Sequence, residues 1–193
     1  QQQYLLQHNR LQLRVVGLAN SRKFLLQEEG VDLNNWKLAM EKATDGSVFD
    51  FTDAIIQKNL RNTVFVDITA SEIVAGVYPK LLAKSIAVVA CNKIACSSPY
   101  EYYRALKDAA HEHNTSFLFE TNVGAALPVI GTLNDLLKSG DRVNSIQAVL
   151  SGTLNFVFNN YNGSRPFAEV VKQAQEEGLS LIHISEPTRL GMI

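Results

Sequence analysis

The stretch SIAVVACNKIA, residues 85–95, decides the fold class of this chain. Residues 86–90 are an unbroken run of apolar and small side chains, which is typical of a strand buried on both faces of a parallel sheet. The run ends in Asn92 and Lys93, and open α/β sheets bind ligands at the carboxyl ends of their strands. The stretch therefore predicts a parallel sheet that carries Lys93 at its ligand-binding edge.

Strands and helices alternate through residue 120. We expect strands at residues 12–19, 63–68, 86–90 and 116–120, and helices at residues 33–42, 53–60, 70–82 and 99–113. Alternation with continuous apolar strands indicates an α/β fold built on a Rossmann-like, doubly wound parallel sheet. After residue 120 the pattern changes, and we expect a helix that ends near residue 139, a strand at 143–150 and helices at 151–158 and 166–177.

The composition excludes several classes of function. The chain has 193 residues, of which 46% are hydrophobic and 19% charged, with a net charge of −1. A near-neutral charge without basic clusters argues against a nucleic-acid partner, and no apolar run is long enough to span a membrane. Cys91 and Cys96 flank Lys93 without C-x-x-C spacing, so reduced thiols of a cytoplasmic protein are favoured over a redox pair.

Both ends of the chain depart from this pattern. A dinucleotide-binding domain opens with a strand and a G-x-G-x-x-G turn, and the sequence has no such turn. We interpret residues 1–9 as the end of the first helix, with the first strand and glycine loop missing; a fold that never had the loop is the alternative. Residues 179–189, LSLIHISEPTR, resemble the translation of a sequencing adapter, and we expect residues 179–193 to be non-native.

The turn Asn20-Ser21-Arg22-Lys23 follows the expected strand at 12–19. NAD-binding folds place an acid here for the ribose 2′-hydroxyl, and this turn has none. An amide, a hydroxyl and two cations suit a 2′-phosphate, which a guanidinium binds through two hydrogen bonds. We predict that Asn20, Ser21 and Arg22 bind NADP, with NAD as the alternative; a solvated basic turn is the interpretation without a ligand.

Thr69, Ala70 and Ser71 follow the strand at 63–68 and are expected at the same edge as Lys93. Small side chains let a ring approach, and Thr69 can donate a hydrogen bond, although these residues can equally cap a helix. The Lys93 ammonium can stabilise a developing alkoxide or carry a proton in a carbonyl/alcohol interconversion. A surface lysine without a catalytic role is the alternative.

Two further turns offer ligand groups. Residues 120–125, ETNVGA, bring one carboxylate and several turn carbonyls, which suit an alkali or alkaline-earth cation, although a strand-end glutamate before a glycine is usually only a turn. Residues 151–153, SGT, offer hydroxyls and a helix N-terminus to an anionic group, with a simple helix cap as the alternative.

Three motifs carry a family resemblance: ACNKIA at 90–95, FETNVGAALPVI at 119–130 and VLSGTLNFVFN at 149–159. In this order and spacing they closely resemble homoserine dehydrogenase. ANSRK at 19–23 and GVDLNNW at 30–36 look most like the dehydrogenase half of bifunctional aspartokinase/homoserine dehydrogenases. The resemblance implies an oxidoreductase that reduces aspartate semialdehyde to homoserine with NAD(P)H, in threonine and methionine biosynthesis.

The resemblance also implies site residues. Lys93 becomes the active-site lysine near the nicotinamide, Thr69, Ala70 and Gly178 lie near the cofactor, and Thr153 lies near the substrate. A monovalent cation, Na or K, is expected to be bound by one carboxylate and three main-chain carbonyls: Glu120, Val123, Ala125 and Leu127.

The implied organisation is a truncated Rossmann domain at 1–122, the start of an α+β catalytic and dimerisation domain at 123–178, and a non-native tail at 179–193. The family continues after Gly178 with an acidic substrate-binding segment and a second lysine, so we expect this chain itself to be inactive. The parent protein is expected to be a cytoplasmic homo-oligomer, with room for an aspartokinase domain before residue 1. Another Rossmann-fold oxidoreductase and a non-catalytic nucleotide-sensing module are the alternatives.

Overall fold

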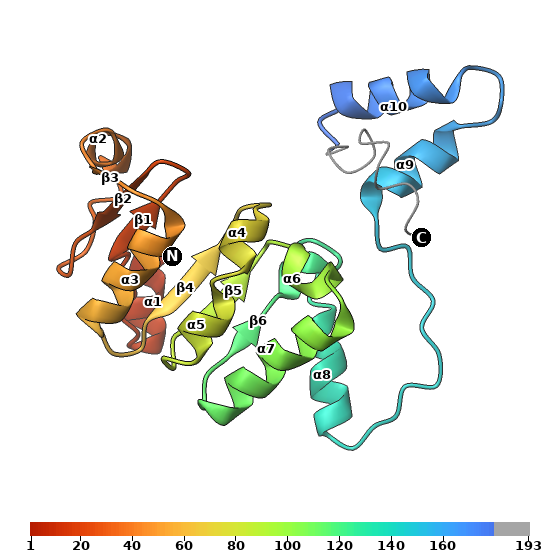
Figure 1. The fold of residues 1–193 in the computed structure, drawn as a ribbon. Helices are drawn as coiled ribbons and strands as arrows, with labels where there is room; N and C mark the ends of the chain where they lie inside the picture. Colours follow the sequence, from red (N-terminus) through yellow and green to blue (C-terminus); the bar gives the residue numbers. More distant parts are fainter. Residues whose placement is uncertain (180–193) are drawn as a thin grey trace. The chain divides into compact units, whose positions relative to one another are not determined.

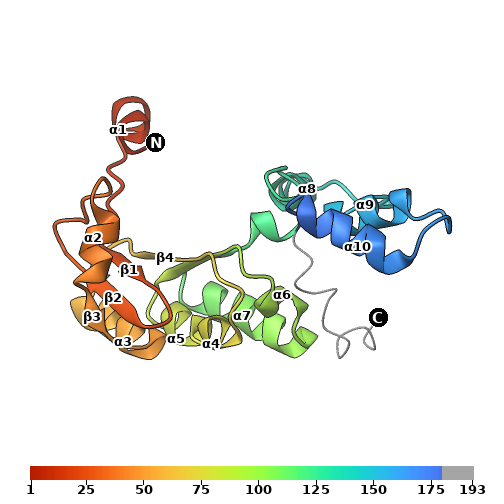
Figure 2. The same ribbon diagram turned by 90° about the horizontal axis from the view of Figure 1, so that it is seen from above.

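The computed structural model describes residues 1–179 and divides the chain into two compact units, Gln1–Asn122 and a second unit that begins at Val123. Figures 1 and 2 show the ribbon from two directions. Each unit has a hydrophobic core of its own, a large one in the first unit and a small one in the second. The expectation that residues 179–193 are non-native falls outside the described residues, except for Leu179.

The first unit contains two small sheets and eight helices among its described elements. In chain order they are α1 (Gln2–Asn9), β1 (Gly17–Ala19), β2 (Lys23–Leu26), α2 (Trp36–Glu41), β3 (Thr44–Asp45), α3 (Val48–Lys58), β4 (Val64–Asp67), α4 (Glu72–Ala75), α5 (Tyr78–Leu82), β5 (Ala87–Ala90), α6 (Ile94–Ser97), α7 (Tyr100–Glu112), β6 (Phe117–Leu118) and the 3₁₀ helix η1 (Glu120–Asn122).

Strands β4, β5 and β6 form a parallel sheet with β5 in the middle. Val64 pairs with Ala87, Asp67 with Ala90, and Val88 with Phe117. Helices α4 and α5 connect β4 to β5, and α6 and α7 connect β5 to β6. The predicted α/β fold with a parallel sheet is therefore confirmed, and the carboxyl ends of all three strands lie at one edge.

The parallel sheet is buried on one face only. Side chains alternate along β4, where Phe65 and Asp67 are buried while Val64 and Val66 are exposed. The buried face packs against α5 and α7, which lie on the same side of the sheet in Figure 2. The expectation that these strands are buried on both faces is wrong for the described residues, because no described element of the first unit covers the opposite face.

Residues 12–19 do not form a parallel strand, which corrects a second expectation. Only Gly17–Ala19 is a strand, and it pairs with β2 in antiparallel fashion, in a separate sheet of order β1-β2-β3. The Asn20 side chain accepts hydrogen bonds from the backbone N–H groups of Arg22 (2.9 Å) and Lys23 (2.8 Å). Asparagine closes turns in this way, so the chain reverses into a hairpin directly after β1.

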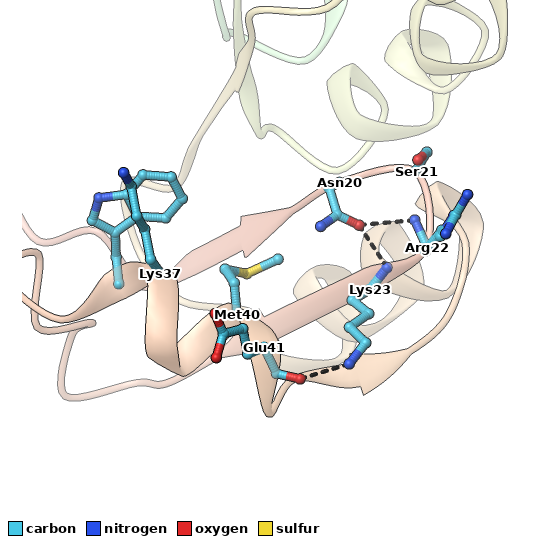
Figure 3. Close-up of a pocket in the computed structure, with 8 residues that line it drawn as sticks. Asn20, Ser21, Arg22, Lys23, Lys37, Met40 and Glu41 are labelled. Carbon is cyan, nitrogen blue, oxygen red and sulfur yellow. Dashed lines mark hydrogen bonds between the residues drawn. The ribbon is translucent and has the colours of Figure 1, made fainter.

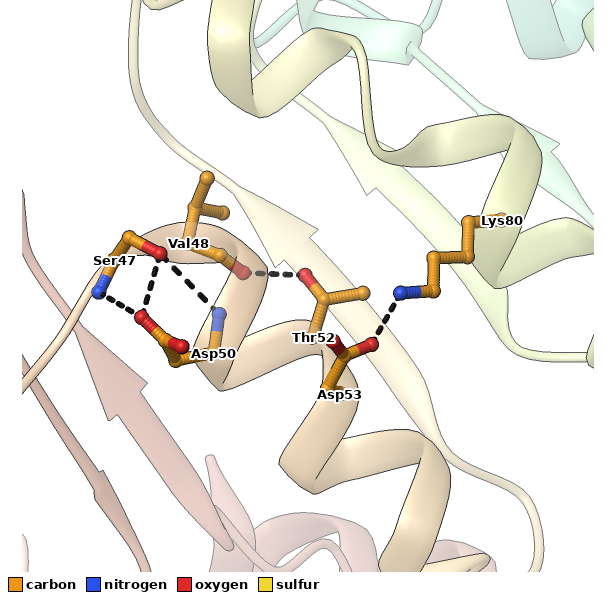
Figure 4. Close-up of polar contacts among 6 residues, drawn as sticks. All are labelled: Ser47, Val48, Asp50, Thr52, Asp53 and Lys80. Carbon is orange, nitrogen blue, oxygen red and sulfur yellow. Dashed lines mark hydrogen bonds and ion pairs between the residues drawn. The ribbon is translucent and has the colours of Figure 1, made fainter.

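Helix α3 begins five residues before the expected helix at 53–60 because a capping box starts it. Ser47 accepts a hydrogen bond from the Asp50 backbone N–H, and the Asp50 carboxylate accepts one from the Ser47 backbone N–H at 2.8 Å (Figure 4). Farther along α3, Asp53 forms an ion pair with Lys80 of α5. This pair joins the helix that precedes β4 to α5, the second helix after β4.

The second unit has three described helices, α8 (Ile130–Lys138), α9 (Gly152–Asn160) and α10 (Phe167–Glu176). Val157 of α9 packs against Val170 and Ala174 of α10. The strand expected at 143–150 is wrong, because these residues have no regular secondary structure and are exposed. A strand needs a hydrogen-bonding partner, and the second unit contains no other strand within its described residues.

Candidate functional site

The carboxyl edge of the parallel sheet brings three loops together. The loop after β4 contains Thr69–Ser71, the loop after β5 contains Asn92 and Lys93, and η1 follows β6 at residues 120–122. The structure thus places Thr69, Ala70, Lys93 and Glu120 on segments that leave the same sheet edge. Ligands bind at this edge in open α/β sheets.

A buried carboxylate lies beneath this edge. Asp67, the last residue of β4, is only 1% exposed and accepts three hydrogen bonds. The Tyr78 hydroxyl donates to Oδ2 at 2.6 Å, the Asn92 Nδ2 amide donates to the same oxygen at 3.0 Å, and the Thr69 backbone N–H donates to Oδ1 at 2.7 Å. The carboxylate therefore connects the loops after β4 and β5.

Asn92 is also buried, at 1% exposure, and both polar atoms of its side chain have hydrogen-bond partners. Its Nδ2 group donates a second hydrogen bond to the Ser71 carbonyl at 3.0 Å, and its Oδ1 atom accepts one from the Ile94 backbone N–H at 3.0 Å. The Asn122 amide donates to the Asn92 carbonyl at 3.2 Å. Asn92 thus contacts all three loops of the edge.

Lys93 directly follows Asn92 and immediately precedes α6. Its carbonyl accepts hydrogen bonds from the backbone N–H groups of Cys96 (3.1 Å) and Ser97 (2.9 Å), so its main chain is fixed by the first turn of α6. Its side chain is exposed and forms no hydrogen bond or ion pair with another described residue. The ammonium group is available to a ligand.

Thr69 and Ala70 are both exposed, as contact with a cofactor requires. The Thr69 hydroxyl accepts a hydrogen bond from the Ser71 backbone N–H at 3.2 Å, which leaves its own proton available to a ligand. Ser71 caps α4 by accepting from the Val74 backbone N–H at 3.4 Å. The capping interpretation of this segment therefore holds, and it is compatible with a cofactor contact at Thr69.

Burial changes the acidity of two groups near the edge. Burial raises the pKa of Tyr78, and its hydrogen bond to Asp67 raises that pKa further, so the hydroxyl stays a proton donor. Burial also raises the pKa of the Cys96 thiol, while a hydrogen bond with Asn122 and the charge of Lys107 oppose the rise. Cys91 is exposed, and both cysteines are free thiols.

The turn at residues 20–23 lines a pocket of about 560 Å³ together with helix α2 (Figure 3). The lining residues are Asn20, Ser21, Arg22, Lys23, Trp36, Lys37, Met40 and Glu41. The Lys23 ammonium donates to the Glu41 carbonyl at 2.6 Å, which holds α2 against the turn. Arg22 is exposed, and its guanidinium forms no hydrogen bond with any described residue.

Sequence reasoning missed the residues that α2 contributes to this pocket. Lys37 lies over the Trp36 ring, 5.8 Å from its centroid, and both are exposed. Glu41 adds a carboxylate where the turn itself has none. Strand β2 and a loop separate α2 from the turn in the sequence, and this spacing gives no signal that the two segments meet.

The residues expected to bind a cation lie on both sides of the boundary between the units. Glu120 begins η1 in the first unit, whereas Val123, Ala125 and Leu127 belong to the second. Gly124 and Ala125 both have positive φ angles, 75° and 52°, so the carbonyl directions change sharply within this turn. A carboxylate with three carbonyls is a donor set that fits an alkali cation. Within the described residues, no three His, Cys, Asp or Glu side chains cluster as a metal site.

Thr153 and Gly178 both lie in the second unit. Ser151 caps α9 by accepting from the Leu154 backbone N–H at 3.2 Å, and Thr153 is half-buried in the first turn of that helix. Gly178 follows α10 with a φ of 77°, a left-handed conformation that favours glycine. Their expected contacts with substrate and cofactor stay predictions.

Within residues 1–179, no helix combines the length and the apolar composition needed to cross a membrane.

Two family descriptions match the chain. The family described as "Homoserine dehydrogenase, NAD binding domain" matches residues 2–120, more than half of the chain. The family described as "Homoserine dehydrogenase" matches residues 128–181.

Relatives and solved structures agree with these matches. The chain is 40% identical over 181 residues to the bifunctional aspartokinase/homoserine dehydrogenase of Haemophilus influenzae. The matched region covers 93% of this chain and 22% of that protein. The chain is 39% identical over 178 residues to the chloroplastic bifunctional aspartokinase/homoserine dehydrogenase 2 of Arabidopsis thaliana, which covers 91% of this chain and 19% of that protein. A hyperthermophilic archaeal homoserine dehydrogenase in complex with NADPH has the same fold, with a TM-score of 0.69 at 22% identity, over 92% of this chain and 56% of that one.

Proposed function

The chain belongs to the homoserine dehydrogenase family, which confirms the resemblance in its sequence, and on that premise we propose that it supplies the active-site lysine of an NAD(P)-dependent reduction of aspartate semialdehyde to homoserine. The chain spans only 22% and 19% of the two relatives described above. The observation that carries the proposal is the exposed Lys93 ammonium at the carboxyl edge of the parallel sheet, which has no ion-pair partner among the described residues.

Lys93 acts on the carbonyl oxygen of the substrate. When bound, the nicotinamide supplies a hydride to the aldehyde carbon, and the oxygen gains negative charge. The Lys93 ammonium stabilises that charge through a charge-assisted hydrogen bond, and the alkoxide then takes one proton from water to become the alcohol. Because the Lys93 main chain is fixed by Asn92 and by the first turn of α6, the ammonium is directed from a rigid base.

The pocket beside α2 supports binding of the adenosine end of NADP. The Arg22 guanidinium has no partner among residues 1–179, and Lys23 and Lys37 line the same pocket, so a 2′-phosphate meets three cations. The Glu41 carboxylate lines it too, and a carboxylate there favours the free ribose hydroxyls of NAD. We assign NADP as the preferred cofactor because the cations outnumber the single acid.

The remaining roles follow the family. Thr69 and Ala70 contact the cofactor from the loop after β4, and Gly178 lies near it, while Thr153 binds the substrate. Glu120 and the carbonyls of Val123, Ala125 and Leu127 hold a monovalent cation, Na or K. The donor chemistry of this set supports an alkali cation.

The whole protein acts as a homo-oligomer in the cytoplasm, and an aspartokinase domain is part of it. The support for the last point is that the relatives from Haemophilus influenzae and Arabidopsis thaliana are bifunctional by name. The name of the Arabidopsis relative includes the word chloroplastic. Fractionation of the source cells therefore tests whether this protein is in the cytoplasm.

The decisive experiment measures oxidation of NADPH by the full-length gene product in the presence of aspartate semialdehyde. Lys93→Ala is expected to reduce kcat about a hundredfold or more, in the range typical of a lost oxyanion-stabilising donor. Lys84→Ala is the matched control, since Lys84 is an exposed lysine three residues before β5 begins. Undiminished turnover in Lys93→Ala contradicts the catalytic role of Lys93. Absence of turnover in the unsubstituted protein supports a nucleotide-sensing module, and faster turnover of another aldehyde supports a different oxidoreductase.

A further inference from the structure

We propose that Asp67 is a positioning residue for Lys93 and that it acts through the side chain of Asn92. The proposal deepens the proposed function and rests on it, because it concerns how the active-site lysine is held. Asp67 itself is buried at 1% exposure, so it acts on the site only through the groups that contact it.

The carboxylate of Asp67 is matched to its three donors. Oδ2 accepts from the Tyr78 hydroxyl and from Asn92 Nδ2, and Oδ1 accepts from the Thr69 backbone N–H. An ionised carboxylate is acceptor-only, so it serves all three donors at once, whereas an amide in its place has one acceptor oxygen. The geometry therefore needs an acid at position 67, although the residue cannot reach a substrate.

Asn92 transmits this arrangement to Lys93. With Nδ2 held by Asp67 and the Ser71 carbonyl, Oδ1 has a single orientation, and that oxygen accepts the Ile94 backbone N–H at 3.0 Å. Lys93 lies between Asn92 and Ile94, so the hydrogen bond closes a short loop around the Lys93 backbone. The direction of the Lys93 side chain follows from the direction of that loop.

The same carboxylate also sets the facing loop. Its bond to the Thr69 backbone N–H and the bond from Asn92 to the Ser71 carbonyl fix the segment proposed to contact the cofactor. One buried group thus determines the separation between the proposed cofactor contact and the proposed catalytic lysine. A displacement of about 1 Å between reacting groups can reduce turnover about a hundredfold.

Asp67→Asn is the first test, with backbone amide exchange as the readout in the 193-residue chain. Exchange of the Thr69 or Ile94 amide is expected to become about tenfold faster, because one donor now faces another donor. The Val88 amide, in the middle of the parallel sheet, reports global unfolding. Equal acceleration at Val88 and Ile94 contradicts the proposal, because it shows a general loss of stability rather than release of the loop.

The double variant Asp67→Asn with Asn92→Asp exchanges donor and acceptor across the hydrogen bond. Asn92→Asp alone places two carboxylates together and is expected to release Ile94, whereas the double variant lets the amide at 67 donate to the carboxylate at 92. Ile94 is expected to be better protected in the double variant than in Asn92→Asp. Strictly additive effects of the two substitutions contradict direct coupling.

Tyr78→Phe is the matched control, because it removes one donor to Asp67 and leaves Asn92 untouched. It is expected to lower stability while Thr69 and Ile94 keep their protection. If Asp67→Asn does not fold, Asn92→Ala is measured in its place, since it leaves Asp67 bound to Tyr78 and Thr69; a protected Ile94 in that variant overturns the proposal.

The catalytic readout uses the full-length gene product. Asp67→Asn is expected to lower kcat about ten- to a hundredfold with KM for NADPH within about threefold, and the double variant recovers part of kcat. An unchanged kcat with a released Ile94 overturns the positioning role. If the unsubstituted protein has no dehydrogenase activity, the proposed function fails, while amide exchange still decides whether Asp67 controls the Lys93 loop.

Discussion

The Tyr78 hydroxyl donates a 2.6 Å hydrogen bond to the Asp67 carboxylate in a place where both side chains are excluded from water. Asp67 is the last residue of β4 and Tyr78 is the first residue of α5. The bond therefore joins a strand to a helix of the connection to the next strand. A charge-assisted bond of this kind is stronger than a bond between neutral groups.

Removal of this bond is expected to destabilise the first unit. Tyr78→Phe keeps the ring in the core and removes one of the two donors to Oδ2 of Asp67, so the free energy of unfolding falls by about 1.5–3 kcal/mol. Urea unfolding followed by circular dichroism measures the difference. Tyr100→Phe, at an exposed tyrosine of α7, is the control and is expected to change little. Equal stability of the two variants contradicts a buried charge-assisted bond.

The capping box of α3 predicts a pH dependence. Hydrogen bonds from the Ser47 hydroxyl and backbone N–H hold the pKa of Asp50 below its ordinary value of 3.8. A pKa that is lower in the folded state stabilises the fold above pH 3.8, and this stabilisation disappears as the pH falls through the folded-state pKa. The stability difference between the unsubstituted chain and Asp50→Asn should therefore shrink below pH 3.8.

Urea unfolding of both proteins between about pH 6 and pH 2 measures this difference. Glu29→Gln, at an exposed glutamate in the loop after β2, provides the control and should show a nearly constant difference. A difference for Asp50→Asn that grows as the pH falls has the wrong sign for a capping carboxylate.

The two cysteines beside Lys93 are expected to react at different rates with iodoacetamide. Cys91 is exposed, whereas Cys96 is partly buried and burial raises the pKa of its thiol, which lowers its thiolate fraction. Cys91 should be alkylated about tenfold faster or more at neutral pH. Mass spectrometry of peptides after timed quenching gives both rates, and Cys91→Ser identifies the slower one. Comparable alkylation rates of Cys91 and Cys96 would contradict this prediction and would mean that helix α6 opens readily.

The pocket beside α2 predicts cofactor preference. Arg22→Ala should weaken NADPH binding about tenfold and leave NADH binding nearly unchanged, because only the 2′-phosphate meets the guanidinium. Glu41→Gln should shift the preference in the opposite direction by removing the competing carboxylate. Titration of nicotinamide fluorescence with the full-length gene product measures both affinities, and Arg61→Ala, at an exposed arginine after α3, is the control. Parallel losses for NADPH and NADH in Arg22→Ala exclude a 2′-phosphate site.

The elements that sequence reasoning located well are those with strong local signals. The strands at 63–68 and 86–90 are apolar runs, and the structure has β4 and β5 within them. The helix expected at 99–113 corresponds to α7, where Leu106 and Ala110 form the buried face. Lys93 was placed at the sheet edge because it follows such a run directly.

The features that sequence reasoning missed depend on contacts between distant residues. Asp67 lies inside the strand expected at 63–68, yet its burial depends on Tyr78 and Asn92, which lie 11 and 25 residues away. Strand β1 pairs with β2 in antiparallel fashion because the Asn20 side chain turns the chain back, and sequence periodicity does not report those hydrogen bonds. The strand expected at 143–150 failed because pairing requires a partner as well as an apolar pattern.

The uncovered face of the parallel sheet has a thermodynamic consequence. Val64, Val66 and Ile68 already contact water in the folded first unit, where Ile68 is 79% exposed. Apolar surface that is hydrated before unfolding adds nothing to the heat-capacity increment of unfolding. Calorimetry should therefore find a smaller increment per residue, and a flatter curve of stability against temperature, than in an α/β domain whose sheet is buried on both faces.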